Sequence, residues 1–210
     1  MTDVTPADLK AWIERFAALI DEHQAELTEL DSAIGDADHG ANMARGMHAV
    51  VARLDDAGNA AEIGKAVGMT LVSTVGGASG PLYGTFFLRL GTAAGTTETL
   101  DAAALGAALR AGVEGVVQRG KAEPGDKTMI DAFIPALQAW DEAVGAGADA
   151  AAAAAAAASA AASGRDATVP LVARKGRASY LGDRSAGHLD PGAASATLLL
   201  EALRDTLATS

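Results

Sequence analysis

Residues 31–40 read Asp31-Ser32-Ala33-Ile34-Gly35-Asp36-Ala37-Asp38-His39-Gly40, and this acidic turn separates two stretches of helical periodicity. Its three carboxylates repel one another at short range, so a fold that gathers them needs a compensating cation. Closely spaced carboxylate oxygens suit Mg²⁺, which usually keeps open positions for water or phosphate. The two glycines let the backbone turn tightly and let a ligand come close. The alternative is a solvated acidic turn between helices, so the turn taken alone supports both interpretations.

Helical patterns extend from the acidic turn in both directions. Before it, Thr5-Pro6-Ala7-Asp8 is typical of a helix start, and apolar residues at three-four spacing predict one helix of about 24 residues. After it, the same signals predict seven further helices. Their expected ranges are about Gly40–Leu54, Ala60–Thr74, Ser79–Leu90, Leu100–Arg119, Asp126–Trp140, Ala150–Ala162 and Ala193–Ala208.

The composition agrees with an all-helical fold. Half of the 210 residues are apolar but only 4% are aromatic, and alanine supplies much of the apolar content. Strands would be richer in β-branched and aromatic residues, whereas alanine has the highest helix propensity. No linker divides the chain, so we expect residues 1–210 to form a single domain.

Charge and residue types exclude several classes of function. The net charge of −11 leaves no basic stripe for a nucleic-acid backbone. The absence of cysteine excludes disulfides and thiolate chemistry. Residues 1–10 lack the basic and apolar regions of a secretion signal, and no stretch is long and apolar enough for a membrane span. We therefore expect a cytoplasmic protein that binds neither nucleic acid nor membranes.

A second glycine-rich segment, residues 76–84, reads Gly-Gly-Ala-Ser-Gly-Pro-Leu-Tyr-Gly and leads into a predicted helix. Small residues there expose backbone N–H groups at the positive end of a helix dipole, which favours an anion. The alternative is an ordinary turn between two helices.

A third segment, residues 120–128, reads Gly-Lys-Ala-Glu-Pro-Gly-Asp-Lys-Thr and is close to a phosphate-binding P-loop. Asp126 is inserted between the glycine and the lysine, and no hydrophobic strand precedes the segment, so we reject the P-loop interpretation. We expect Asp126 or Thr128 to be the N-cap of the next helix, with nucleotide contact as an additional hypothesis.

A fourth segment, Gly164–Gly192, lacks helical periodicity, and structureless segments of this length are often functional lids. Four basic residues, Arg174, Lys175, Arg177 and Arg184, lie within eleven positions. Guanidinium groups on a glycine-rich loop can neutralise phosphate charge during transfer. The alternative is a solvated basic loop that balances an acidic surface.

In this order, the four segments resemble the L subunits of bacterial dihydroxyacetone kinases, the nucleotide-binding subunits of enzymes that depend on the phosphotransferase system (PTS). The resemblance covers nearly the full length. It is carried by Leu30-Asp31, Ile34-Gly35-Asp36-Ala37-Asp38-His39-Gly40 and Asn42-Met43; by the segments Val75–Phe87, Arg119–Met129 and Ala173–Gly182; and by Gly187-His188 and Asp190-Pro191-Gly192-Ala193.

The resemblance implies an all-α, eight-helix antiparallel up-and-down barrel with a nucleotide site at one end and a long capping loop. It implies that Asp31, Asp36 and Asp38 hold two Mg²⁺ ions, that the Arg174–Gly192 loop is a lid, and that Arg177 is catalytic. The implied ADP/ATP-binding residues are His39, Gly40, Ala41, Asn42, Ala78, Ser79, Gly120, Met129, Arg177, Asp190, Pro191 and Gly192.

The resemblance also implies a kinase subunit, a phosphoenolpyruvate–glycerone phosphotransferase that is active only with partner subunits. Bound ADP would act as a coenzyme that the phosphohistidine of an M subunit recharges to ATP. The γ-phosphoryl would then pass to dihydroxyacetone held on a K subunit, giving dihydroxyacetone phosphate. We expect no general base or nucleophile in this chain.

Two other functions stay open. The first is the nucleotide-binding subunit of a kinase that exchanges ADP for free ATP, with dihydroxyacetone or another ketose as acceptor. A free-standing chain and the pair Ala37 and His39 disfavour it, because fused kinases more often show Gly-Asp-Gly-Asp. The second is a non-enzymatic protein that binds Mg-nucleotide in order to dock on a regulator.

Overall fold

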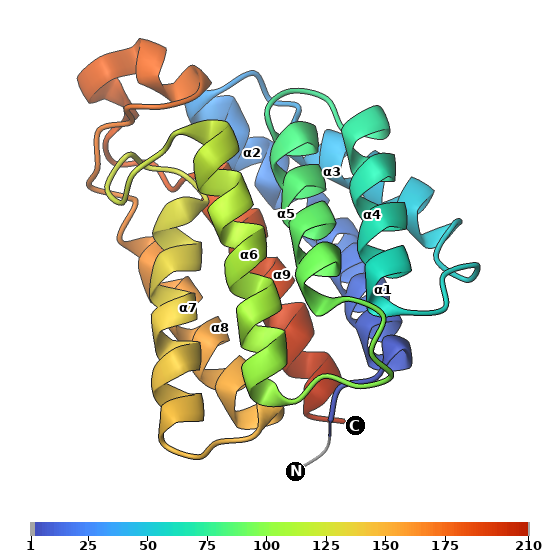
Figure 1. Cartoon of the computed structure of the whole chain (residues 1–210). Coiled ribbons are helices and arrows are strands. Elements are labelled where there is room, and N and C mark those ends of the chain that lie inside the picture. Colours follow the sequence, from blue (N-terminus) through green and yellow to red (C-terminus); the bar gives the residue numbers. More distant parts are fainter. Residues whose placement is uncertain (1–2, 210) are drawn as a thin grey trace.

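The protein is almost entirely helical in the computed structural model, which describes residues 3–209 (Figure 1). Within this range no β-strand forms, and Val4 and Leu100 make one isolated antiparallel bridge. The prediction of an all-α fold is confirmed. The helices are α1 (Pro6–Glu22), α2 (Gln24–Ile34), α3 (His39–Val51), α4 (Ala60–Thr74), α5 (Ser79–Ala94), α6 (Ala102–Gly120), α7 (Ile130–Gly145), α8 (Ala150–Asp166), the 3-10 helix η1 (Arg177–Ser185) and α9 (Pro191–Leu207).

Side-chain caps fix where several helices begin. Thr5 and Asp8 form a reciprocal capping box at the start of α1, in which each side chain accepts the other's backbone N–H. Four further helices begin at a residue whose side-chain oxygen accepts the N–H three positions later. These caps are Asn59, Asp101, Asp149 and Asp190.

The predicted first helix is wrong in one respect, because it is divided at His23, where φ is −103° and ψ is 10°. The division follows from packing. Helices α1 and α2 both contact α3 and α9, and the change of direction at His23 also brings α2 against η1.

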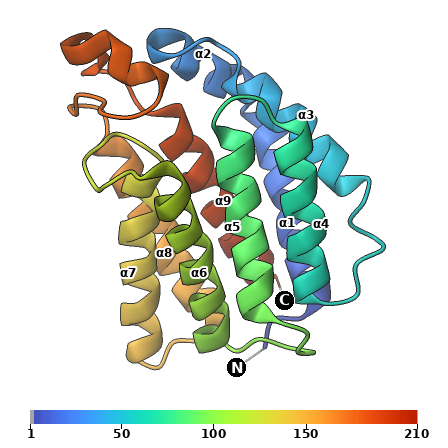
Figure 2. The ribbon, with the colours of Figure 1, turned by 45° about the horizontal axis from the view of Figure 1, so that its top comes forward.

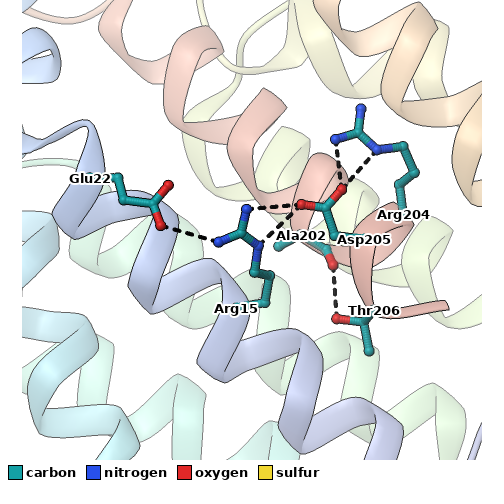
Figure 3. Close-up of polar contacts among 6 residues, drawn as sticks. All are labelled: Arg15, Glu22, Ala202, Arg204, Asp205 and Thr206. Carbon is teal, nitrogen blue, oxygen red and sulfur yellow. Dashed lines mark hydrogen bonds and ion pairs between the residues drawn. The ribbon is translucent and has the colours of Figure 1, made fainter. Parts of the chain in front are cut away.

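The first and last helices are joined directly. Trp12 on α1 is buried, and its indole Nε1 donates to the carbonyl oxygen of Leu199 on α9 at 2.8 Å. The Arg15 guanidinium contacts Asp205 at 3.1 Å and Glu22 at 3.2 Å, as Figure 3 shows. A buried indole bond and an ion-pair network thus connect the two ends of the chain.

Consecutive helices pack side by side along the chain, and α9 is the most enclosed of them. Thirteen of its residues are buried, including all residues from Ala193 to Leu200. It contacts α1, α2, α7 and α8. Because one helix is surrounded in this way, the eight-helix antiparallel up-and-down barrel stays a prediction.

Small residues let two helix pairs approach closely. A β-carbon added at Gly91 on α5 would lie 2.8 Å from the α-carbon of Gly64 on α4, so no side chain fits between these helices. The alanine-rich helix α8 presents a buried face of six alanines to its neighbours: Ala150, Ala153, Ala154, Ala157, Ala158 and Ala161. Alanine there acts as a spacer that keeps α8 near α7 and α9.

The direction of the helices brings several N-termini to one end of the molecule. Helices α3, α5, α7 and α9 all begin at the end where α2, α4, α6 and α8 finish (Figures 1 and 2). Residues 167–190, which we call the cap segment, extend beyond that end and are orange in both views. None of the helices in residues 3–209 has the length and apolar character needed to cross a membrane.

Candidate functional site

A cavity of about 270 Å³ lies at the end of the molecule where the four helices begin. Its walls come from all four segments that the sequence singled out, together with Val116 of α6. The contributing ranges are 31–42, 76–82, 120–130 and 175–192. Segments as far apart in the sequence as residues 31–42 and 175–192 therefore form one site.

Three aspartates, Asp31, Asp36 and Asp38, form what we call the carboxylate cluster. Each offers one oxygen, and the three oxygens lie within 4.8 Å of one another. Asp31 is buried, whereas Asp36 and Asp38 are exposed at the cavity. Hard oxygen donors at this separation fit one or more divalent cations such as Mg²⁺, with further positions left for water or phosphate.

The position of Asp31 depends on backbone contacts within its own turn. Its Oδ2 accepts the N–H groups of Asp38 at 2.9 Å and of His39 at 3.2 Å, which fixes the start of α3 against the end of α2. A side chain at Gly35 would collide with the Asp31 carboxylate, so this position requires glycine. Ala37 adopts a φ of 61°, a left-handed conformation that is unusual for a residue with a side chain.

The four helix N-termini surround the cavity with partial positive charge. His39 and Asn42 of α3, Ala78 and Ser79 at the start of α5, Met129 at the start of α7 and Pro191 at the start of α9 all line it. The first N–H groups of a helix lack intrahelical partners, and the helix dipole favours negative charge beside them. The cavity therefore combines carboxylates for a cation with helix ends for an anion.

His39 is buried between hydroxyl groups. Its Nδ1 lies 3.1 Å from Ser79 Oγ, and its Nε2 lies 2.9 Å from Ser195 Oγ, which in turn lies 2.7 Å from the Tyr83 hydroxyl. Burial lowers the pKa of His39, against the opposing effect of the neighbouring Asp31 and Asp38. Burial also raises the pKa of the Tyr83 hydroxyl. The imidazole is thus neutral near pH 7 and is held in place by Ser79 and Ser195.

The cap segment is more ordered than the sequence predicts. Helix α8 continues to Asp166, and residues 177–185 form η1, so the prediction of a structureless Gly164–Gly192 loop is wrong. Ala178 and Leu181 of the cap pack against Ile34 at the end of α2. This apolar contact seats η1 beside the carboxylate cluster.

Arg177 at the start of η1 reaches the carboxylate cluster. Its Nε lies 2.8 Å from Asp36 Oδ2, and the two side chains are 67% and 35% exposed. Lys175 also lines the cavity, whereas Arg174 and Arg184 are exposed and do not. The basic segment therefore divides into two residues at the site and two outside it.

The turn before α7 differs from the expected cap. Helix α7 begins at Ile130 with Met129 as N-cap, and the side chain of neither Asp126 nor Thr128 occupies that position. Instead the Asp131 carboxylate accepts the N–H of Gly125 at 2.5 Å and that of Thr128 at 2.8 Å. Asp131 thus holds two points of the turn, while the Thr128 hydroxyl accepts the N–H of Ile130, the first residue of α7, at 3.2 Å.

Asp190 is a buried carboxylate on the cavity wall. Its Oδ2 accepts the N–H of Ala193 at 2.7 Å and caps α9. Burial raises the pKa of Asp190 to about 7; Asp131 and Asp31 add to this effect, and the Ala193 bond and Lys127 oppose it. The side chain therefore changes charge close to neutral pH.

Most of the predicted site residues come together at the cavity. The exceptions are Gly40, which is buried against Gln24 and Thr28 of α2, and Ala41, which is exposed outside the cavity. Tyr83 and Ser195 were not predicted as site residues. Each lies on the buried face of a helix, and no local sequence pattern marks it as part of a site. Lys127 was also missed, although the comparison with a P-loop had drawn attention to that lysine.

A family model described as the DAK2 domain matches residues 33–205. The chain is 45% identical over 195 residues to the PEP-dependent dihydroxyacetone kinase, ADP-binding subunit DhaL, of Escherichia coli, covering 91% of this chain and 92% of the relative. It is 46% identical over 202 residues to the PTS-dependent dihydroxyacetone kinase, ADP-binding subunit DhaL, of Lactococcus lactis, covering 94% of this chain and 95% of the relative.

A solved structure shows the same fold. The dihydroxyacetone kinase from C. freundii, in complex with AMP-PNP and Mg²⁺, superimposes with a TM-score of 0.72 and 26% identity over 98% of this chain. The match covers 35% of that kinase, so the chain corresponds to about a third of it.

Proposed function

The chain belongs to the DAK2 domain family, and we propose that it is the ADP-binding subunit of a dihydroxyacetone kinase. In this proposal residues 1–210 act as one nucleotide-binding domain. ADP or ATP with Mg²⁺ occupies the cavity, and the chain is a kinase subunit that needs partner subunits for turnover.

The main support for the proposal is that the carboxylate cluster and four helix N-termini line the same cavity. Asp31, Asp36 and Asp38 would hold two Mg²⁺ ions, which neutralise phosphate charge and orient the phosphoryl group when bound. The N–H groups at the starts of α3 and α5, with Ser79, would bind phosphate oxygens. Gly120, Met129 and the start of α9 would line the rest of the nucleotide site.

Arg177 is the proposed catalytic residue. Its ion pair is with Asp36, whose carboxylate would also help to hold a metal ion. A metal ion there would compete with the guanidinium for Asp36, and Arg177 would then be free to stabilise charge on the transferred phosphoryl group. The seating of η1 on Ile34 keeps the released side chain close to the site.

The proposed partners follow from what the site lacks and from the relatives. His39 is buried and both of its ring nitrogens contact hydroxyl groups, so no free nitrogen is left to act as a nucleophile. We propose that a K subunit supplies bound dihydroxyacetone and that the phosphohistidine of an M subunit regenerates ATP from the retained ADP. The names of the E. coli and L. lactis relatives, which are PEP- or PTS-dependent ADP-binding subunits, support this assignment.

Reconstitution tests the function and its alternatives. The purified chain is combined with dihydroxyacetone, a K subunit and a phosphorylated M subunit, with ADP only in amounts equal to the chain. Dihydroxyacetone phosphate formed without added ATP supports the proposal. Product formed only with free ATP favours a nucleotide-exchanging kinase, and nucleotide binding without any product favours a regulator-binding protein.

The same assay tests Arg177. Arg177→Ala should lower phosphoryl transfer at least about 100-fold, because loss of one preorganised charge on a developing anion typically costs that much. The melting temperature should stay near that of the parent, since the Arg177 side chain is largely exposed. Arg184→Ala is the matched control, because Arg184 lies in the same helix outside the cavity. Equal rates for parent and Arg177→Ala would refute the catalytic role.

A further inference from the structure

Lys127 is a buried lysine that the proposed nucleotide chemistry does not use. It is 1% exposed, and its backbone has a φ of 63° in the left-handed region. An ammonium group has three N–H donors and no acceptor, so a buried one needs several oxygens around it. The contacts of the Lys127 ammonium therefore indicate its role in the structure.

Five backbone carbonyl oxygens surround the Lys127 ammonium. Those of Ser185, Thr168 and Leu171 lie 2.8, 3.0 and 3.1 Å from Nζ. Those of His188 and Val169 complete the set. A shell of carbonyl oxygens is also how proteins bind a dehydrated monovalent cation. The Lys127 ammonium thus occupies the place that a monovalent cation would take, and we call the five carbonyl oxygens around it the carbonyl cage.

The five carbonyls come from the two arms of the cap segment. Residues 168–171 lead out from α8 into the cap, and residues 185–188 lead back from η1 toward α9. Lys127 itself belongs to the turn before α7, so its side chain joins three separate parts of the chain. No other ammonium or guanidinium group in residues 3–209 makes such a set of backbone contacts.

Neighbouring hydrogen bonds also join the two arms, and we call this junction the neck of the cap. Gly187 donates its N–H to the Val169 carbonyl at 2.7 Å, and Ala173 donates to Ser185 Oγ at 2.8 Å. Arg174 donates its N–H to the carbonyl of Asp126, the residue before Lys127, at 3.0 Å. The route from this neck to Arg177 is short, since only two residues separate Arg174 from Arg177.

We propose that Lys127 is a positioning residue whose ammonium acts as a built-in monovalent cation, joining residues 168–171 to residues 185–188 and thereby placing Arg177 beside Asp36 of the carboxylate cluster. The role of Arg177 in phosphoryl transfer rests on the proposed function, but the joining of the arms does not. Without the ammonium, the five carbonyl oxygens lose the donor that they share, and the arms separate.

The first test is tryptic cleavage of the whole protein with Lys127→Met, which keeps an unbranched side chain of nearly the same length and removes its charge. The cap contains four cleavage sites, at Arg174, Lys175, Arg177 and Arg184. Cleavage there should be about 10-fold faster or more than in the parent, since local opening sets its rate. Lys65→Met, at an exposed position on α4, should be cleaved like the parent.

The second test is chemical rescue of Lys127→Ala. n-Propylammonium replaces the atoms from Cγ to Nζ and should restore protection of the cap, whereas n-propanol at the same concentration should not. Because Lys127 lines the cavity, the amine has a route to the cage. Rescue by n-propylammonium but not by n-propanol would show that positive charge in the carbonyl cage protects the cap from cleavage. If lost packing were the reason, both compounds should restore protection.

The outcomes separate this inference from the proposed function. Unchanged cleavage of the cap in Lys127→Met overturns the inference, and so does a Lys127→Ala protein that is unfolded and is not rescued by the amine. If the parent binds no Mg-ADP, the proposed function fails, while the cleavage and rescue results still decide the role of Lys127. If it binds, Lys127→Met should release Mg-ADP about 10-fold faster or more, in line with the opening of the cap.

Discussion

Asp31 shows how one side chain serves both the fold and the site. One of its oxygens accepts the N–H groups of Asp38 and His39, and the carboxylate belongs to the cluster at the cavity. Asp36 differs, because it is exposed and its one ion pair in the structure is with Arg177. Substitution of Asp31 should therefore change both the fold and the site, whereas substitution of Asp36 should change mainly ligand binding.

Asp36→Asn should weaken Mg-ADP binding at least about 100-fold, since loss of a metal's outer-shell partner alone costs 10- to 100-fold. Without ligand the variant should be as stable as the parent or slightly more so, because one of three repelling charges is gone. Calorimetric titration and thermal melting measure the two effects. Glu29→Gln, an exposed change on α2, the helix that precedes the turn with Asp36, is the control. Unchanged affinity would refute the metal assignment.

Asp190 gives the protein a dependence of stability on pH. Its pKa of about 7 in the folded state lies above the ordinary value of 3.8, so the folded protein holds a proton that the unfolded chain releases. Its contribution to the free energy of unfolding is fully present below pH ~4 and declines as pH rises to about 7, by at most about 1.4 kcal/mol per unit.

Asp190→Asn tests this dependence, because asparagine can still accept the N–H of Ala193 but does not titrate. Denaturation by urea at pH 5, 6, 7 and 8, without Mg²⁺ or nucleotide, gives the free energy of unfolding of both proteins. The parent should lose more stability than the variant between pH 5 and pH 7. Parallel curves would show that Asp190 does not titrate in this range.

At the residue scale, the sequence predicted those site residues that have local signals. The aspartates and glycine-rich turns stand close together in the chain, so their chemistry is visible without a structure. Tyr83 and Ser195 were missed because their contacts with His39 join three helices. The five carbonyls around Lys127 carry no side-chain signal at all.

Among the elements, most helix ranges could be predicted from periodicity and capping residues. The change of direction between α1 and α2 and the 3-10 helix η1 could not. The break at His23 depends on which partners α1 and α2 meet, and no local residue announces it. η1 was missed for a similar reason, because it is held by contacts with Ile34 and by the neck near Lys127. Long-range packing, not propensity, decides both.

The close crossing of α4 and α5 leads to a prediction about these two elements. Gly91→Ala should lower the free energy of unfolding by about 1–3 kcal/mol, because its β-carbon would force the helices apart. Gly145→Ala at the end of α7 meets no atom within 4 Å and should be neutral or stabilising by up to about 1 kcal/mol. Urea denaturation measures both, and equal effects would contradict the packing argument.

At the scale of the whole molecule, a ligand that binds only the folded protein stabilises every element at once. Mg-ADP at a hundred times its dissociation constant should add about 2.7 kcal/mol to the free energy of unfolding. For a chain of 210 residues this corresponds to a rise in melting temperature of roughly 5–11 °C. ADP with a chelator is the control, and a melting temperature indifferent to Mg-ADP would argue against a nucleotide site.

We expect this chain to retain Mg-ADP as a coenzyme in the cavity formed by the carboxylate cluster and four helix N-termini. The most direct measurement is the nucleotide content of the protein purified in Mg²⁺, released by acid and identified by chromatography. Near-stoichiometric ADP that survives gel filtration and leaves only with a chelator is the predicted result. An empty protein that takes up no ADP or ATP when Mg²⁺ is supplied would contradict the claim.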